Sequence, residues 1–272
     1  PTSATSPPIA SSPTGAVRNF TSYGPVELSR LLERLPLKAQ SRHLVVCPLY
    51  HSAAQAFVLL HVAIGATVVL QRHLDPAATL GIMRRLAIDS TFLVPTMIQR
   101  IVDLPLELKE PRPGSLRCLV SGAAPFSQRL REQAIDYFGA KTIFDFYGAT
   151  ELGWVTLING QEMLERPTSV GRTLAGQSIR VRKNGADAPT GAVGIIWVSS
   201  AQIMAGYLNQ EPASELDGWM TVDDLGYVDA DGYIYLAGRD RDMVISGGVN
   251  IYPVEIEELL LTHPEVQDVA VV

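Results

Sequence analysis

Short apolar runs alternate with helix-like segments between residues 43 and 148, and this alternation limits the possible folds more than any other feature. The apolar runs lie at 43–48, 66–71, 90–94, 116–122 and 142–148. The segments with helical spacing lie at 53–65, 75–87, 95–104 and 127–139. Almost continuous apolar runs are typical of strands buried on both faces. The pattern therefore predicts the α/β class, with a parallel sheet that is covered by helices on both faces.

The pattern changes near Gly153, where the segments become short, β-branched and separated by Gly, Pro, Asn and Asp. Such spacing is typical of antiparallel strands joined by tight turns. We therefore expect three units: an α/β subdomain over 1–152, an antiparallel β-barrel-like subdomain over 153–240, and the truncated beginning of a small, mobile C-terminal α+β domain over 241–272. About 30 residues are too few for an independent core.

Composition excludes several classes of function. The chain has 272 residues and a net charge of −6, and it has no basic stripe of the kind that binds nucleic acid. No apolar run reaches about 18 residues, so no integral membrane segment is expected. The Ser/Thr/Pro-rich N-terminus lacks a signal-peptide pattern, which favours the cytoplasm. Cys47 and Cys118 lie in apolar strand-like runs, so we interpret them as buried thiols.

Three motifs carry the candidate chemistry: SGAAP at 121–125, FDFYGATE at 144–151 and GRDRDMVISGGVNIYPVEIE at 238–257. In this order and separation they resemble the AMP-forming acyl-adenylate enzymes, the superfamily of acyl-CoA synthetases, adenylation domains and luciferases. The resemblance covers nearly the whole chain. It implies ATP or AMP, Mg²⁺ and coenzyme A as ligands.

The resemblance implies roles for the residues of the first two motifs. Gly122, Ala123 and Ala124 would form a wall against adenine. Asp145 would accept a hydrogen bond from the adenine amino group, and Tyr147 would stack on the ring next to Gly148. Thr150 would bind the phosphate, and Glu151 would ligate Mg²⁺. Taken alone, the second motif also fits a surface turn with a capping glutamate, and the first fits a tight strand-to-helix turn.

A further stretch that resembles the family, GWMTVDDLGYVDADGYIYLAGR at 218–239, implies a ribose site, and the third motif implies a hinge. Asp224 aligns with the carboxylate that accepts from both ribose hydroxyls, a role suited to an acceptor-only group. Arg239 would reach the ribose or the α-phosphate. Asp223 stands where the family usually has glycine. Arg241 aligns with the hinge residue, and Gly247 and Gly248 would approach the pantetheine arm closely, although a plain β-turn explains that pair equally.

An aromatic–histidine pair gives the candidate acyl pocket. In PLYHSAA (48–54) the resemblance makes Tyr50 and His51 the residues that line the carboxylate pocket. A histidine beside a helix start is also commonly structural. No aspartate lies nearby to bind an amino-acid ammonium group, which favours a simple carboxylic acid with an apolar acyl or aryl group.

The chain departs from the family at its start and its end. The phosphate loop of the family ends in Pro-Lys-Gly, whereas the corresponding residues here are Pro13-Thr14-Gly15, without lysine. Thr2, Ser3, Thr5 and Ser6 are the best remaining phosphate ligands. The long region before the loop and the C-terminal catalytic lysine lie outside these residues. We therefore expect a fragment or a gene with divergent ends, and either self-association or a complementing chain, because sheet edge and core would otherwise be exposed.

The sequence thus predicts an AMP-forming carboxylic acid–CoA ligase, present as an incomplete chain. Two alternatives stay open. One is a non-catalytic homologue that binds AMP or an acyl-adenylate, which the loss of the loop lysine favours. The other is an adenylating enzyme that loads the phosphopantetheine thiol of a carrier protein, because the Gly-Gly pair fits either thiol.

Overall fold

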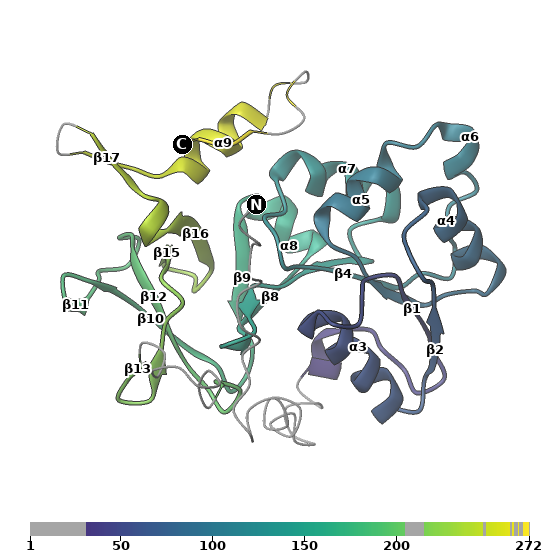
Figure 1. Cartoon of the computed structure of the whole chain (residues 1–272), viewed down its shortest axis with the longest axis horizontal. Coiled ribbons are helices and arrows are strands. Elements are labelled where there is room, and N and C mark those ends of the chain that lie inside the picture. Colours follow the sequence, from purple (N-terminus) through teal and green to yellow (C-terminus); the bar gives the residue numbers. More distant parts are fainter. Residues whose placement is uncertain are drawn as a thin grey trace, which may run out of the picture.

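The structure is a computed structural model, and it describes residues 31–204, 215–246, 249–261, 263, 266 and 269–271. It contains an α/β half and a β-rich half that lie side by side. In the view of Figure 1 the C-terminal helix lies at the top, between the two halves. The α/β class and the antiparallel β-rich part that the sequence predicts are both confirmed.

The α/β half is built on a parallel sheet with the strand order β2-β1-β3-β4-β5. These strands are β1 (Arg42–Val45), β2 (Thr67–Leu70), β3 (Ser90–Phe92), β4 (Cys118–Ser121) and β5 (Ile143–Asp145). Apart from β2 they are almost entirely buried, which is why their sequences are apolar without alternation. β2 forms the outer edge.

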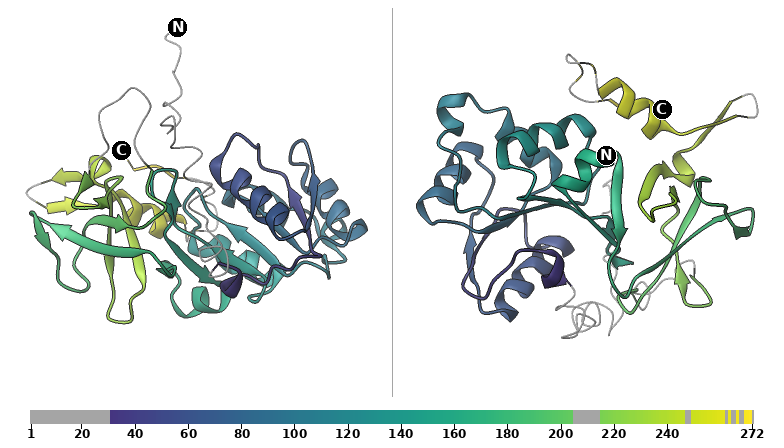
Figure 2. Two further views of the ribbon diagram at one scale, coloured as in Figure 1. Left: turned by 90° about the horizontal axis from the view of Figure 1, so that it is seen from below. Right: turned by 180° about the vertical axis from the view of Figure 1, so that it is seen from behind.

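Helices cover both faces of this sheet. They are α3 (Ser52–Ala63), α4 (Pro76–Arg85), α5 (Pro95–Val102), α6 (Leu106–Lys109), α7 (Gln128–Phe138) and α8 (Gly160–Glu165). One core cluster joins the sheet to α4, α5 and α7, and a second joins the other face to α3, so α3 lies on the opposite side of the sheet (Figures 1 and 2). The expected helix starts are also correct, because the Asp75 side chain accepts from Ala78 N–H and Pro76 begins α4.

The β-rich half continues the same sheet with antiparallel strands. β8 pairs with β5, and the order then runs β8-β9-β16-β15-β12-β10-β11, with β14 and β13 added beside β12. The strands are β8 (Thr156–Asn159), β9 (Ser169–Thr173), β10 (Ser178–Lys183), β11 (Ala186–Asp187), β12 (Gly194–Ser199), β13 (Glu215–Leu216), β14 (Trp219–Met220), β15 (Asp224–Val228) and β16 (Ile234–Arg239). Because the pairing passes from β5 to β8 without a break, the expected division at residue 152 stays a prediction.

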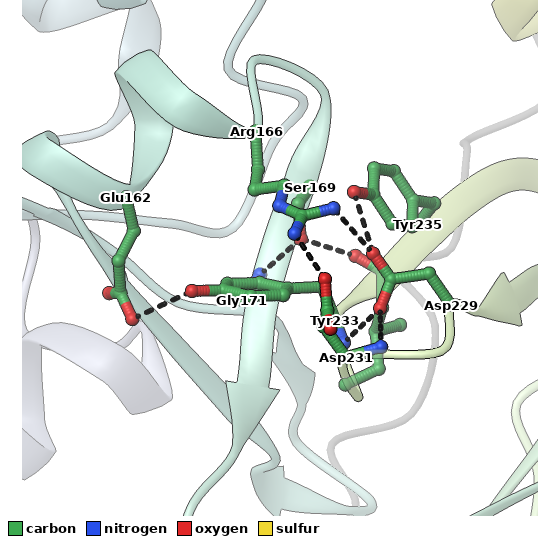
Figure 3. Close-up of polar contacts among 9 residues, drawn as sticks. Glu162, Arg166, Ser169, Gly171, Asp229, Asp231, Tyr233 and Tyr235 are labelled. Atoms are coloured by element: carbon green, nitrogen blue, oxygen red, sulfur yellow. Dashed lines mark hydrogen bonds and ion pairs between the residues drawn. The ribbon is translucent and has the colours of Figure 1, made fainter.

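A polar network fastens the β15–β16 hairpin to α8 and β9 (Figure 3). Arg166, which follows α8, donates to Asp229 Oδ2 at 3.1 Å and also forms an ion pair with Asp231. The Tyr233 hydroxyl donates to Glu162 Oε1 at 3.3 Å. These contacts connect segments about 65 residues apart in the chain, so they fix the hairpin against the α/β half.

The last described part leaves the sheet. A 3₁₀ turn at Asp240–Asp242 leads to an antiparallel ribbon, β17 (Val244–Ser246) and β18 (Val249–Ile251), and then to α9 (Pro253–Leu261). The ribbon projects away from both halves in Figure 1. α9 contacts the start of α7, where Gln128 N–H donates to Glu258 Oε2 at 3.5 Å.

Two smaller expectations concern cysteines and membrane spans. Cys47 and Cys118 are both buried and unpaired, as predicted. Within the described ranges, every helix is too short or too polar to cross a bilayer.

Candidate active site

The YGATE turn is a close-packed ribbon. β6 (Gly148–Ala149) pairs with β7 (Gly153–Trp154). A Cβ at Gly148 would lie 2.2 Å from the Gly153 carbonyl oxygen, so only glycine allows this approach. Thr150 is exposed at the tip of the turn, and Glu151 is half-buried beside it. The turn therefore presents the candidate phosphate and metal ligands from a rigid base.

The start of α3 meets this turn. Ser52 Oγ lies 3.2 Å from Thr150 Oγ1. Ser52 follows Tyr50 and His51, whose rings have centroids 4.4 Å apart, and the Tyr50 side chain is 81% exposed. Ser52 thus links the segment that carries the candidate acyl residues to the turn that carries Thr150, and the roles of Tyr50 and His51 stay predictions. Ser52 itself was not singled out, because its partner is 98 residues away.

The SGAAP turn leaves the end of β4. A Cβ at Gly122 would lie 2.5 Å from the Phe146 ring, which explains the glycine. Ala123 and Ala124 are exposed, and Ala123 has a φ of 68°. An alanine in the left-handed region is unusual and strained. The two residues offer small, solvent-facing surface of the kind that a flat ring can lie against.

Asp145 ends β5 and is only 4% exposed. Its Oδ2 accepts a hydrogen bond from Arg131 Nη2 at 2.9 Å, and its Oδ1 has no hydrogen-bond partner among the described residues. Burial raises the pKa of Asp145 to about 6, and the Arg131 guanidinium opposes that rise. At neutral pH the carboxylate is ionised and has one oxygen left to accept a hydrogen bond.

Three of the predicted site residues meet at the carboxylate of Asp224. The Tyr147 hydroxyl donates to Asp224 Oδ2 at 2.8 Å, and Arg239 Nε donates to Oδ1 at 3.2 Å. The Asp224 side chain is 13% exposed and that of Arg239 is 47% exposed. Burial raises the pKa of Asp224, whereas its bonds to Tyr147 and Arg239 oppose the rise. The Arg239 guanidinium and the Asp224 carboxylate therefore lie side by side at the surface of the β-rich half.

The Tyr147 ring is mostly covered, with 8% of the residue exposed. Burial raises the pKa of its hydroxyl well above the usual range, and the neighbouring Asp224 carboxylate adds to the rise. The hydroxyl therefore stays protonated and acts as a donor to Asp224. Stacking of this ring on adenine stays a prediction.

Asp223, which stands where the family usually has glycine, adopts a backbone conformation that favours glycine. Its φ is 63°, in the left-handed region that aspartate tolerates better than most residues. Its N–H donates to Thr221 Oγ1 at 2.9 Å, and its carbonyl accepts from Asp240 N–H at 2.9 Å. Two hydrogen bonds thus hold the turn before Asp224 in this conformation.

The hinge and phosphate-loop candidates are only partly described. Arg241 lies in the 3₁₀ turn directly after β16. Gly247 and Gly248 lie outside the described residues, as do Thr2, Ser3, Thr5 and Ser6.

A comparison with known protein families shows which family this chain matches. The model of the AMP-binding enzyme family matches residues 16–208. The chain belongs to this family. The 2-succinylbenzoate–CoA ligase of Bacillus licheniformis is 34% identical over 264 residues, which are 95% of this chain and 54% of the relative. An uncharacterized acyl–CoA ligase of Bacillus subtilis, YhfT, is 35% identical over 77% of this chain and 42% of its own length. The chain therefore spans about half the length of these curated relatives.

Solved structures agree with the family assignment. The o-succinylbenzoate-CoA synthetase of Bacillus subtilis, in complex with its acyl-adenylate intermediate, aligns with a TM-score of 0.81 and 29% identity over 92% of this chain and 51% of that one. The same synthetase has also been solved with ATP and a magnesium ion. An amide bond synthetase, McbA from Marinactinospora thermotolerans, aligns with a TM-score of 0.83 and 28% identity, and the match covers 89% of this chain and 50% of that one.

Arg131 and Ser121 also belong to this region, and the sequence analysis gave neither a role, although Ser121 is the first residue of the SGAAP motif. Arg131 lies within a helical segment that reads as an ordinary charged helix, and Ser121 reads as the last residue of a strand. Apart from helical spacing, which turns Arg131 toward the sheet with Leu130 and Ala134, no sequence signal marks them as site residues.

Proposed function

We propose that this chain carries the nucleotide-binding and acid-binding half of an AMP-forming carboxylic acid–CoA ligase. The observation that carries the proposal is the meeting of Tyr147, Asp224 and Arg239 at one carboxylate, in a chain of the AMP-binding enzyme family. The reaction class is formation of an acyl-adenylate from a carboxylic acid and ATP, followed by transfer of the acyl group to the thiol of coenzyme A.

The residues supply mainly electrostatic stabilisation. Asp224 accepts from the ribose hydroxyls, and the exposed Arg239 guanidinium binds the ribose or the α-phosphate with its remaining N–H donors. Thr150 donates to the α-phosphate, aided by its contact with Ser52. Donors that are held in place before charge develops lower the barrier to attack by the acid carboxylate at phosphorus.

Magnesium binding rests on Glu151. No cluster of three or more metal-ligating side chains is present among the described residues. The single Glu151 carboxylate fits Mg²⁺ in nucleotide enzymes. There the ion typically binds one or two protein carboxylates and completes its shell with phosphate oxygens and water. When bound, the ion neutralises charge on the ATP phosphates.

The acid is proposed to be aryl or apolar acyl. Two observations support this class. The relatives include 2-succinylbenzoate–CoA ligases, and the segment 48–54, which carries the exposed Tyr50 and His51 and reaches Thr150 through Ser52, contains no aspartate for an ammonium group. The thiol is coenzyme A, with a carrier-protein phosphopantetheine as the alternative acceptor. A cytoplasmic location is part of the same proposal.

A nucleotide-binding protein without turnover is the second candidate. The observation that favours it is the phosphate loop, where Thr14 stands in place of the lysine and prolines remove backbone donors. Under this alternative the Asp224 site would still bind AMP.

Association with a second copy or a complementing chain is also proposed. Leu70 on the edge strand β2 is 65% exposed, and Val62 and Leu59 on α3 are 60% and 42% exposed. An exposed edge with apolar neighbours is a surface that other chains commonly cover.

Two measurements test the function. Calorimetry would show AMP binding, and Asp224→Asn is expected to weaken it by roughly 10-fold because a charged acceptor becomes neutral. The matched control, Asp136→Asn on the exposed face of α7, should leave affinity unchanged.

ATP–pyrophosphate exchange with a panel of aryl and fatty acids then separates the candidates. Exchange with any acid supports the ligase, whereas AMP binding without exchange supports the non-catalytic homologue.

A further inference from the structure

The YGATE turn is held by a short segment that follows β12. Gln202 lies 48 residues beyond Trp154 in the chain, yet its Oε1 accepts a hydrogen bond from Trp154 N–H at 3.0 Å. Two residues later, Met204 N–H donates to the carbonyl oxygen of Glu151 at 2.8 Å. Both ends of the stretch from Glu151 to Trp154 are therefore bonded to the segment 202–204.

The Gln202 side chain also packs directly against the backbone of the turn. A Cβ at Gly153 would lie 2.3 Å from Gln202 Oε1 and 2.7 Å from Gln202 Cβ. Gly153 has a φ of 76°, so its conformation and this contact both require glycine. Gln202 is only 8% exposed. The absence of a side chain at Gly153 thus makes room for a buried amide.

The orientation of the Gln202 amide is fixed. A backbone N–H can only donate, so the amide oxygen, and not the nitrogen, must face Trp154. The backbone of the segment is anchored as well, because Gln202 N–H donates to Ser200 Oγ at 3.0 Å. Met204 is 4% exposed and belongs to the same buried cluster as Leu152. The segment therefore approaches the turn from a fixed position.

The bonded stretch begins at the candidate metal ligand. Glu151 is bonded through its carbonyl oxygen, and Thr150, the candidate phosphate ligand, precedes it at the tip of the turn. We propose that Gln202 is a positioning residue that holds Thr150 and Glu151 in place for a magnesium-bound triphosphate before the nucleotide arrives. This inference rests on the proposed function and adds a residue on which its magnesium-dependent binding depends.

Loss of the Gln202 amide should therefore weaken binding without removing any ligand of the metal or the phosphates. A turn that is ordered in advance costs less conformational freedom when the nucleotide binds. Removal of a group that orients a metal ligand typically lowers metal affinity or activity by about 10–100-fold.

The test compares ATP with Mg²⁺ against adenosine, by calorimetry with the 272-residue chain. Adenosine has no phosphate, so its affinity reports the base and ribose sites and the fraction of folded chain. Gln202→Met keeps the length of the side chain and has no acceptor oxygen. In this variant the ratio of the ATP affinity to the adenosine affinity should fall by roughly 10-fold or more. A merely structural role would lower both affinities together and leave the ratio unchanged.

Two further variants control for the loss of packing. Gln202→Glu keeps an acceptor oxygen at the same reach, whether the carboxyl group is ionised or protonated. Its ratio should be closer to that of the unchanged chain than to that of Gln202→Met. Gln177→Met is the matched control, because Gln177 is half-buried and its Oε1 has no hydrogen-bond partner among the described residues. That substitution should leave the ratio unchanged.

Hydrogen exchange gives a measurement that needs no variant. The Trp154 amide should exchange slowly in the chain without nucleotide, because its bond to Gln202 is already formed. Addition of ATP and Mg²⁺ should change its rate little. Rapid exchange that slows only when the nucleotide binds would show that the ligand orders the turn, and would overturn the inference.

The binding outcomes are also distinct. An unchanged ratio in Gln202→Met overturns the inference and leaves the proposed function intact. An equal loss in Gln177→Met overturns it too, because the loss would then not depend on the bond to Trp154. If the unchanged chain binds ATP with Mg²⁺ no more tightly than adenosine, the proposed function fails, and the inference fails with it.

Discussion

At the scale of single residues, two positions of the candidate site adopt a backbone conformation that suits glycine better than the residue present. Ala123 has a φ of 68° and Asp223 a φ of 63°. Aspartate tolerates this region through its short polar side chain, whereas alanine has no such compensation. Ala123 therefore holds backbone strain at the proposed adenine wall, as residues of binding sites often do.

Replacement of Ala123 by glycine should relieve that strain. We expect Ala123→Gly to raise the free energy of unfolding by about 1 kcal/mol, since the left-handed conformation costs an alanine roughly 1–2 kcal/mol and glycine loses part of the gain to chain entropy. Urea unfolding measures the change. The neighbouring Ala124→Gly is the control, and it should lower stability, because no positive φ is recorded there. Equal effects of the two substitutions would contradict the assignment of strain.

The hydroxyl of Tyr147 gives a second prediction at this scale. Tyr147→Phe leaves Asp224 Oδ2 without its donor in a mostly buried position. We expect the free energy of unfolding to fall by about 1–3 kcal/mol, the usual cost of an unpaired buried acceptor. Tyr50→Phe removes a hydroxyl from a side chain that is 81% exposed and should change stability little. Thermal unfolding of both variants would show whether the two hydroxyls differ.

At the scale of elements, the sequence was sufficient for the order of strands and helices and insufficient for the contacts between them. The apolar runs and the caps at Asp75 and Gly139 locate the elements because these signals are local. The ion pair of Arg131 with Asp145 and the contact of Ser52 with Thr150 depend on how elements pack. Sequence spacing carries little information about such packing, so the motif residues were found and their supporting partners were not.

Two buried histidines are a further case in which the sequence did not reveal a contact between elements. His43 of β1 and His61 of α3 lie on either side of Ser90 of β3, with Nδ1–Oγ and Oγ–Nε2 distances of 3.0 and 2.9 Å. His61 Nδ1 lies 2.7 Å from the Phe57 carbonyl oxygen and must donate to it. In the neutral ring, His61 Nε2 then accepts from the Ser90 hydroxyl, which accepts from His43 Nδ1–H. This chain of hydrogen bonds requires a neutral His61, because a protonated Nε2 could not accept from the Ser90 hydroxyl.

These histidines predict a pH dependence of stability. Burial lowers the pKa of both rings, so the unfolded chain binds more protons than the folded chain once the pH falls below about 6.5. Stability is full above that pH and should fall below it by at most about 1.4 kcal/mol per pH unit for each histidine. The raised pKa of Asp145, about 6, acts in the opposite direction below pH 6 and offsets part of the loss.

Urea unfolding at pH 7.5, 6.5 and 5.5 measures this slope. His61→Gln should make the slope shallower, because it removes one of the two groups whose protonation favours the unfolded chain. His73→Gln, at an exposed position, should leave the slope unchanged. A stability that does not change with pH over this range would contradict the prediction.

At the scale of the whole molecule, the two halves share one continuous sheet and a polar network, yet the surfaces at the far ends differ in character. The hairpin of the β-rich half is fastened through Arg166, Asp229 and Asp231. The opposite end of the sheet finishes at β2, whose side chains are exposed or half-buried, with the apolar outer face of α3 beside it. The chain also spans about half the length of its curated relatives. An exposed edge strand beside an apolar helix face is a surface that other protein chains commonly cover.

The last prediction follows from that surface. We expect the chain to associate in a concentration-dependent way, with an average mass above 29.5 kDa in analytical ultracentrifugation at micromolar concentrations. Val62→Glu on α3 and Leu70→Lys on β2 should each shift the equilibrium toward the monomer, because a charge on an apolar edge opposes its burial. Leu106→Lys on α6, which is 64% exposed on a helix away from this edge, is the matched control and should leave the equilibrium unchanged. A stable monomer at all concentrations would show that the β2–α3 surface does not mediate self-association.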